Sequence, residues 1–335
     1  MSKANWKESM DIEVKSRLEK WRAAIAEHLH NPGYDQEPAY LAEPMNYALQ
    51  AEGKMLRPAI CLAAVEAVGG KWQNATQVAA ALEIFHTFTL IHDDIMDGDE
   101  LRRGIPTLHK AFGESRALLS GDTLLIYVYQ LLSETEANTF PRVFKAFNEG
   151  AMDVCRGQGW DMEFENTNHV APEQYEMMID LKTGALIKLA CHLGGIVGGG
   201  SDEAIEALSR FGLLLGRAFQ MQDDLLEVTS SSATMGKSLG SDVLNEKKTW
   251  IWLDLKHRMT EDQQKEWQEI QNGGLLEDHH RLLVKTWMEK HGTINRAQEM
   301  VASWISEADS LLNSSHFEHT EMLKALSDII LNRQN

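Results

Sequence analysis

Two clusters of acidic residues interrupt segments that are otherwise apolar and patterned like helices. Residues 93–97 read Asp-Asp-Ile-Met-Asp, and residues 223–227 read Asp-Asp-Leu-Leu-Glu. In each cluster the first and last acids are four residues apart, so their side chains leave one helical face a single turn apart. Carboxylates gathered beside an apolar face repel one another and resist losing their water. A strong cation would remove both costs.

Solvated acids on an exposed helix surface would give the same pattern. The preceding segments, residues 79–92 and 211–221, are too apolar for ordinary exposed helices. Hard oxygen donors at this density suit Mg²⁺, which usually keeps some waters and completes its shell with substrate phosphates. The clusters therefore predict that the chain holds a phosphorylated substrate through magnesium, at the end of an apolar channel.

The composition is that of a globular protein and narrows the partners. The length of 335 residues allows one large domain or two, and the net charge of −18 argues against nucleic acid or an anionic membrane as a partner. The three cysteines are scattered, which argues against a disulfide framework and for the cytoplasm. Residues 1–11 lack an apolar signal core, and the apolar stretch 186–200 is too short and interrupted to span a bilayer.

Nearly every segment has a helical period, and no run alternates as a strand would. Breaks rich in Gly, Pro, Asn and Ser fall at residues 31–33, 69–70, 104–106, 166–172, 194–200, 229–240, 273–274 and 292. The spacing between them predicts about a dozen helices of roughly 12–25 residues. Thr260 with Gln263 has the spacing of a capping box that opens one of them. No linker divides the chain, so we predict one all-α domain over residues 1–335.

Basic residues form a second signature. Lys54 and Arg57 are three residues apart, which is one turn of a helix, and Arg102 and Arg103 follow the first acid cluster. In so acidic a chain, paired cations beside a metal site indicate anion recognition, with Arg giving bidentate contacts to phosphate oxygens. Surface ion pairs with neighbouring acids are the alternative. Three further cations extend this set: Lys182, Lys237 and Lys247.

One metal-bound phosphate would not need this many cations, whereas two anionic substrates would. One would be chelated through magnesium and the other held directly by Lys and Arg. A metal-bridged pyrophosphate is a good leaving group, and an apolar cavity can shelter the resulting carbocation if water is excluded. His86 and His92 have no partners at zinc-site spacing, so we interpret them as hydrogen-bonding groups on a helix face.

These motifs resemble the trans-type polyprenyl (isoprenyl) diphosphate synthase family over nearly the whole chain. Any one motif is weak, but eight in the same order are specific. They are Gly53-Lys54-x-x-Arg57-Pro58, residues 90–97, Leu101-Arg102-Arg103-Gly104, residues 121–125, Gly157-Gln158, Lys182-Thr183-Gly184, residues 219–224, and Gly236-Lys237-x-x-Gly240-x-Asp242 with Lys247.

The resemblance implies an isoprenoid-synthase-type helical bundle around a deep central cavity. It also implies a homodimer and a requirement for Mg²⁺, with three ions when the diphosphate is bound. The implied metal ligands are Asp93, Asp97 and Asp223, supported by Asp94 and Asp224. The residues implied to touch the allylic diphosphate are Arg102, Lys182 and Lys237.

The resemblance assigns a second set of residues to isopentenyl diphosphate, namely Lys54, Arg57, His86 and Arg103. Thr183 and Gln220 would line the path of the cation, and Lys247 would close a lid formed by the segment before it. The implied reaction is ionisation of the allylic diphosphate, attack by the isopentenyl double bond, and loss of a proton. The chain departs from the family pattern at Glu52, Met55 and Glu227, where Gly, a basic residue and Asp are usual.

Product length is expected to depend on the residues before the first acid cluster. With a rise of about 1.5 Å per residue, Phe88 lies roughly 7.5 Å and Phe85 roughly 12 Å below Asp93. An aromatic residue at Phe88 beside the small Thr89 resembles enzymes that make geranylgeranyl diphosphate (C20). Farnesyl diphosphate (C15) is the alternative product.

Two alternatives of another kind remain. A non-catalytic partner subunit would be expected to lose an acid cluster or the Arg pair, and this chain keeps both. A terpene cyclase uses one diphosphate and would not need Lys54, Arg57 and Arg103. Their joint presence favours condensation of two diphosphates.

Overall fold

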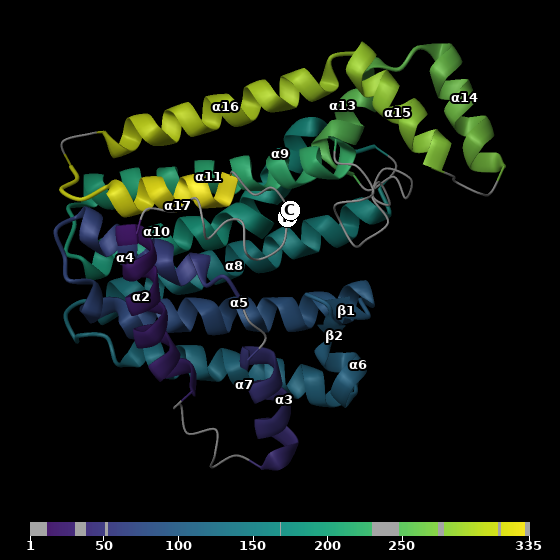
Figure 1. The fold of residues 1–335 in the computed structure, drawn as a ribbon. Coiled ribbons are helices and arrows are strands. Elements are labelled where there is room, and N and C mark those ends of the chain that lie inside the picture. Colours follow the sequence, from purple (N-terminus) through teal and green to yellow (C-terminus); the bar gives the residue numbers. More distant parts are fainter. Residues whose placement is uncertain are drawn as a thin grey trace.

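The computed structural model describes residues 12–30, 38–50, 53–167, 169–229, 248–273, 278–313 and 316–331, which form a helical bundle (Figure 1). The all-α prediction is confirmed, because the only strands among these residues are two of two residues each, paired as a hairpin. In chain order the elements are α2 (Ile12–His30), α3 (Ala39–Gln50), α4 (Leu56–Ala67), the 3₁₀ turn η2 (Trp72–Ala75), α5 (Thr76–Asp97), β1 (Leu101–Arg102), β2 (Ile105–Pro106), α6 (Leu108–Phe112), α7 (Glu114–Ser133), α8 (Phe140–Glu165), α9 (Pro172–Ile179), the π-helical turn η3 (Asp180–Gly184), α10 (Ala185–Val197), α11 (Asp202–Thr229), α13 (Trp250–Arg258), α14 (Glu261–Asn272), α15 (Asp278–Lys290), α16 (Thr293–Leu312) and α17 (Glu321–Leu331).

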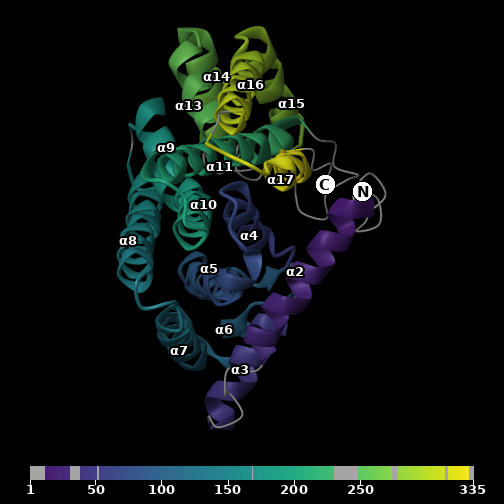
Figure 2. The same ribbon diagram turned by 90° about the vertical axis from the view of Figure 1, so that its left-hand side faces the viewer.

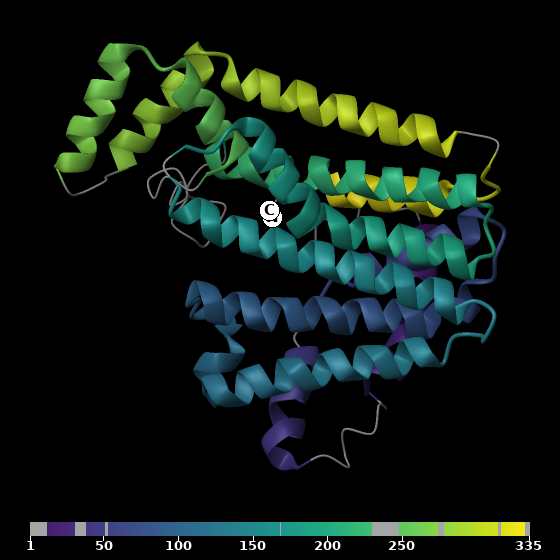
Figure 3. The same ribbon diagram turned by 180° about the vertical axis from the view of Figure 1, so that it is seen from behind.

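The helices stack in layers when the bundle is seen end-on (Figure 2). Helix α16 lies over α11, α10 and α4 lie beneath α11, and α5 and then α7 lie below them. Helices α4 and α10 are enclosed and therefore apolar on nearly every face, with buried residues at almost every position. Helices α14 and α15 extend away from the bundle at one end, as the view from behind also shows (Figure 3).

Local signals in the sequence set several of the helix ends. The predicted capping box is confirmed: the Thr260 hydroxyl accepts from the Gln263 backbone N–H at 3.3 Å, and the Gln263 side chain accepts from the Thr260 N–H at 3.0 Å. These bonds satisfy N–H groups that have no partner within α14. None of the helices in the described part of the chain is long and apolar enough to cross a membrane.

The prediction that Lys54 and Arg57 lie one helical turn apart is wrong. Helix α4 begins only at Leu56, and Met55 before it has φ of 48°, in the left-handed region. Proline lacks an N–H and fits the first turn of a helix, so Pro58 favours a helix that begins here rather than before Lys54. Arg57 is on the helix, whereas Lys54 is exposed on the segment that leads into it.

The carboxyl-terminal ends of α5, α8 and α11 lie at the same end of the bundle (Figure 1). Both acid clusters are therefore in the last turns of their helices, at the end where the β1–β2 hairpin follows α5. A helix carries partial negative charge at its carboxyl terminus, so carboxylates are disfavoured there unless cations accompany them.

A continuous helical segment, residues 172–197, contains the π turn η3 in its middle. The backbone of α8 contacts this turn so closely that a β-carbon on Gly157 would lie 2.2 Å from the backbone nitrogen of Lys182. Only glycine fits at that point, which gives a structural reason for the Gly157-Gln158 motif. Single π turns inside α-helices are often found at functional sites.

Replacing Gly157 by Ala is expected to push α8 away from η3 and to lower the free energy of unfolding by about 1–3 kcal/mol, because the obstructing atoms are backbone. Gly159→Ala is the matched control on the same helix, since nothing lies within 4 Å of its β-carbon position. That control should be neutral or stabilising by up to about 1 kcal/mol. Chemical denaturation measures both, and equal effects would contradict the close approach.

Candidate active site

The first acid cluster is paired with a cation from the neighbouring hairpin. Asp94 is buried, and its Oδ1 accepts a hydrogen bond from Nε of Arg102 at 2.5 Å. Arg102 also lies 3.9 Å from Asp93 and 3.8 Å from Asp99. The hairpin that follows α5 therefore returns Arg102 to the carboxylates at the end of that helix.

The carboxylates of this cluster do not ionise freely. Partial desolvation and the nearby Asp93 raise the pKa of Asp97 to about 6. Burial raises the pKa of Asp94 in spite of its ion pair with Arg102. Both shifts have the direction expected for acids that lack sufficient positive charge nearby, so the site favours an additional cation.

Lys182 of η3 brings a second cation to the same cluster. Its Nζ lies 2.5 Å from Oδ2 of Asp161 and 3.5 Å from Oδ1 of Asp93. Burial opposes the charged form, but Asp93 and Asp161 outweigh it and raise the pKa of Lys182. The sequence reasoning missed Asp161; its signal was the position one helical turn after Gly157 on α8.

The second acid cluster is held by hydrogen bonds. Tyr175 of α9 donates to Oδ2 of the buried Asp224 at 2.5 Å, and Gln220 donates to Oδ1 at 3.1 Å. Thr183 of η3 in turn donates to Oε1 of Gln220 at 2.9 Å. Tyr175 was also missed, because nothing in the sequence links it to a residue 49 positions away.

The π turn connects the two clusters. Its adjacent residues Lys182 and Thr183 bond in different directions, one toward Asp93 on α5 and the other toward Gln220 on α11. Asp180, in the same turn, makes a two-pronged ion pair with Arg217 of α11, with both distances 2.5 Å. The turn is therefore anchored to α11 at one end and faces α5 with its lysine.

A second basic cluster lies about two helical turns before the first acid cluster along α5. Arg57 of α4 is 3.0 Å from Nε2 of His86. Burial and the nearby Arg57 and Arg103 hold the pKa of His86 well below its usual value, so the ring is neutral and accepts the bond. Glu83, one turn before His86 on α5, is buried beside these arginines and was not singled out from the sequence.

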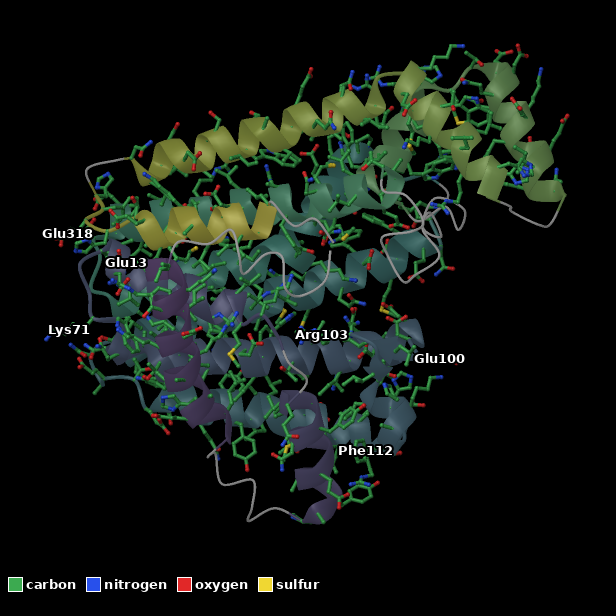
Figure 4. All side chains as sticks on the ribbon, in the orientation of Figure 1. Glu13, Lys71, Glu100, Arg103, Phe112 and Glu318 are labelled. Carbon is green, nitrogen blue, oxygen red and sulfur yellow. The ribbon has the colours of Figure 1, made fainter. Side chains whose placement is uncertain are left out.

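Arg103 occupies a strained position in the hairpin. It has φ of 54° and is followed by Gly104 with φ of 82°, the pattern of a two-residue hairpin turn in which both central residues have positive φ. An arginine rarely adopts this conformation, and such strain is concentrated at functional sites. Figure 4 shows Arg103 over α5 toward the middle of the molecule, while Glu100 lies at the outer edge.

A cavity of about 70 Å³ adjoins this basic cluster. The acidic and basic residues that line it are Glu83, His86, Asp94, Arg102 and Arg103. Its other walls are mainly apolar and come from α3, α5 and the hairpin, for example Tyr47, Leu90 and Ile105. Cationic side chains therefore meet an apolar surface at the edge of the site.

Comparison with known proteins identifies the family. A model of the polyprenyl synthetase family matches residues 38–283. The chain belongs to the polyprenyl synthetase family. The prediction of a trans-prenyltransferase enzyme, made from the order of the motifs, is confirmed, and the terpene cyclase alternative is disfavoured.

Curated relatives align with most of this polyprenyl synthetase chain. Geranylgeranyl diphosphate synthase of Methanosarcina mazei is 42% identical over 242 residues, which cover 71% of this chain and 73% of that protein. Short chain isoprenyl diphosphate synthase of Methanothermobacter thermautotrophicus is 33% identical and covers 97% of this chain and 100% of that protein. Among solved structures, geranylgeranyl pyrophosphate synthetase from Pyrococcus horikoshii Ot3 superposes with a TM-score of 0.88 at 32% identity, covering 96% of this chain and 99% of that one.

The positions expected to set product length lie on α5 among aromatic side chains. The Phe88 ring packs 5.7 Å from that of Phe85 and 4.6 Å from that of His92, measured between ring centroids. Thr89 is partly buried, and its hydroxyl donates to the carbonyl of His86 at 2.8 Å. Phe85 is fully buried and also packs on Phe147 of α8.

Part of the predicted site lies outside the described residues: Lys237, Lys247 and the segment predicted as a lid. In the part of the chain that is described, no three His, Cys, Asp or Glu side chains converge into a closed metal site.

The lowered pKa of His86 can be tested by NMR titration of its imidazole signals, assigned by comparison with His86→Gln. The ring is expected to remain neutral well below the usual midpoint of 6.5. Its contribution to stability is then present above pH ~6.5 and is lost as the pH falls toward the folded-state pKa, because the unfolded chain binds the proton more readily. Arg57→Gln should raise the midpoint. A wild-type midpoint near 6.5 would contradict the proposed environment.

Proposed function

We propose that this polyprenyl synthetase condenses isopentenyl diphosphate with an allylic diphosphate and releases geranylgeranyl diphosphate as its main product. The observation that carries the proposal is that cationic side chains form two groups along α5, about two helical turns apart. One combines Asp93 and Asp97 with Arg102 and Lys182, and the other combines Arg57, His86 and Arg103. Two diphosphates need two sites, whereas a cyclase needs one.

The residues fit a magnesium-bound allylic diphosphate at the first cluster. Carboxylates at the carboxyl-terminal end of a helix, with a pKa raised to about 6 at Asp97, favour a hard cation. We assign Asp93, Asp97 and Asp223 as ligands, with Asp94 and Asp224 as supports. Bound magnesium would neutralise the diphosphate as it leaves.

Arg102 and Lys182 would assist by donating hydrogen bonds to the diphosphate. When the allylic C–O bond breaks, its electron pair leaves with the diphosphate, and the neighbouring cations stabilise that charge. The Thr183 hydroxyl donates to Oε1 of Gln220 at 2.9 Å. The partial negative charge on these two oxygens can stabilise an allylic cation beside them. The isopentenyl double bond then forms the new C–C bond, and a proton is lost to the released diphosphate.

Alanine at Asp93 or at Asp223 is expected to reduce kcat by roughly 10²-fold or more, because an electrostatic contact with the departing charge is lost. The measurement is steady-state incorporation of labelled isopentenyl diphosphate across a range of Mg²⁺ concentrations. Asp328→Ala, an exposed acid on α17, is the control and should retain activity. Near-normal turnover in either site variant would overturn the metal assignment.

The C20 product is supported by the relatives named geranylgeranyl diphosphate synthase and by the aromatic residue at position 88. Farnesyl diphosphate remains the alternative product and is not better supported. The packing of Phe88 against Phe85 and His92 leaves its ring in a fixed place on α5, as a residue that limits chain growth would require.

Phe88→Ala is expected to lengthen the product beyond C20, since it removes a ring roughly 7.5 Å below Asp93. Thr89→Phe should shift the product toward C15. Chromatography of products at matched turnover decides, because general damage to the core lowers stability without changing the distribution. An unchanged C20 peak in both variants would show that another wall, such as Phe85, ends the chain.

We further propose that the enzyme is a homodimer. Helices α7 and α8 lie next to each other at the edge of the bundle (Figure 2) and carry several exposed apolar residues, namely Leu118, Leu119, Ile126, Phe144, Met152 and Met162. Exposed apolar residues gathered on neighbouring helices are typical of association surfaces, and a second copy of the chain is the occupant that the family resemblance implies. The single domain over residues 1–335 and the cytoplasmic location stay predictions.

A further inference from the structure

One partly buried ion pair has no part in the reaction described above. Nε and Nη2 of Arg217 on α11 donate to Oδ1 and Oδ2 of Asp180 on η3, each at 2.5 Å. The two side chains are only 20% and 21% exposed. Two parallel N–H···O bonds fix the orientation of the partners as well as their distance. This geometry distinguishes the pair from exposed surface ion pairs, many of which contribute nothing measurable to a fold.

Arg217 is held by a second element as well. Its guanidinium carbon lies 5.8 Å from the centre of the Trp304 ring on α16, and Trp304 is 9% exposed. A guanidinium within about 6 Å of a tryptophan ring centre is attracted to the ring. The charged end of Arg217 thus contacts both α16 and the π turn.

The backbone at this point leaves little room. A β-carbon on Gly216 would lie 2.5 Å from Cα of Gly184, so the backbones of α11 and the π turn approach closely. Helix α8 approaches the same turn at Gly157. Glycine contacts of this kind limit the distance between backbones, but they do not determine the direction in which the side chains of the turn point.

A second cross-link joins the π turn to α11. It is the hydrogen bond from Thr183 to Gln220, and its residues lie three positions after Asp180 and Arg217. One cross-link would allow the turn to rotate about it, whereas two oppose rotation. The i→i+5 bonds of a π turn involve only the backbone, so they could form at other positions along the helix. Contacts of particular side chains therefore decide which residues form the turn.

We propose that the Arg217–Asp180 ion pair positions the π turn for the reaction. Held at residues 180–184, the turn directs Lys182 toward the first acid cluster and Thr183 toward α11. This inference rests on the proposed function, in which Lys182 binds the allylic diphosphate and Thr183 lies beside the allylic cation. Arg217 and Asp180 act through these two residues and do not touch the substrate themselves.

An ion pair that only stabilises the fold makes a different prediction. Its loss would lower the melting temperature, but the folded enzyme would keep its kcat and KM values. Loss of a positioning pair affects the allylic substrate alone, because Lys182 and Thr183 both serve that substrate. Since misplacement by about 1 Å can cost about 10²-fold in rate, we expect kcat to fall by about 10- to 100-fold. The KM of the allylic substrate should rise, and the KM of isopentenyl diphosphate should stay unchanged.

The experiment is steady-state kinetics of the double variant Asp180→Asn/Arg217→Met, with each substrate varied in turn and a melting curve recorded alongside. Removing both charges together leaves no unpaired charge in the bundle, so this variant should keep its fold. The matched control is Arg210→Met/Glu307→Gln, which removes a more exposed ion pair between α11 and α16, with a distance of 2.9 Å. Arg210 lies about two turns before Arg217 on the same helix. The control should keep kcat and both KM values.

Normal kcat and KM values in the folded double variant would overturn the inference, as would an equal rise in KM for both substrates. If the double variant fails to fold, Arg217→Lys is tested in the same way. Lysine keeps the charge but loses the two-pronged geometry, so a smaller loss confined to kcat and the allylic KM is expected, and wild-type kinetics would overturn the inference. Failure of the wild-type enzyme to condense the two diphosphates would instead count against the proposed function. The two failures are therefore distinguishable.

Discussion

The repulsion among carboxylates at the carboxyl-terminal ends of α5 and α11 is the constraint around which the site is organised. Each acid is disfavoured by its neighbours and by the partial negative charge of its own helix end. The chain answers with groups from other elements: Arg102 from the hairpin, Lys182 from the π turn, and Tyr175 and Gln220 at Asp224. Arg102 and Lys182 are brought to the acids by irregular elements, a tight turn and a π turn, whereas Tyr175 and Gln220 come from the helices α9 and α11.

The two anion sites differ in how their cations are held. Arg102 and Lys182 are bonded to Asp94 and Asp161 and lie 3.9 Å and 3.5 Å from Asp93, which we propose as a magnesium ligand, so binding of the metal and diphosphate there would compete with these contacts. Arg57 is instead hydrogen-bonded to the neutral ring of His86, which is not a proposed metal ligand. The first site would therefore exchange contacts on loading, whereas no metal competes for the Arg57–His86 bond.

The sequence was sufficient for features that depend on neighbours along the chain. Helical periodicity, the Thr260 capping box and the placement of both acid clusters at helix ends were predictable because each depends on residues within one or two turns. Asp161, Tyr175 and Glu83 were not, because their partners come from segments far away in sequence. The relation of Lys54 to Arg57 was misjudged for a local reason: three-residue spacing has its helical meaning only after the helix has begun, and α4 begins at Leu56.

The π turn at residues 180–184 has a consequence for the helical phase of the segment that contains it. A π turn accommodates one residue more than an α-helical turn, and one residue corresponds to about 100° of rotation around a helix. The side chains of α9 are therefore rotated by that angle relative to those of α10. With this rotation, Tyr175 and Thr183 both reach the Gln220–Asp224 pair. A single-residue deletion that restored a regular α-helix would improve the local hydrogen bonding while rotating one half of the network away from the other. The number of residues in this segment therefore cannot change by one without disrupting the network, although both ends of the segment are ordinary α-helix.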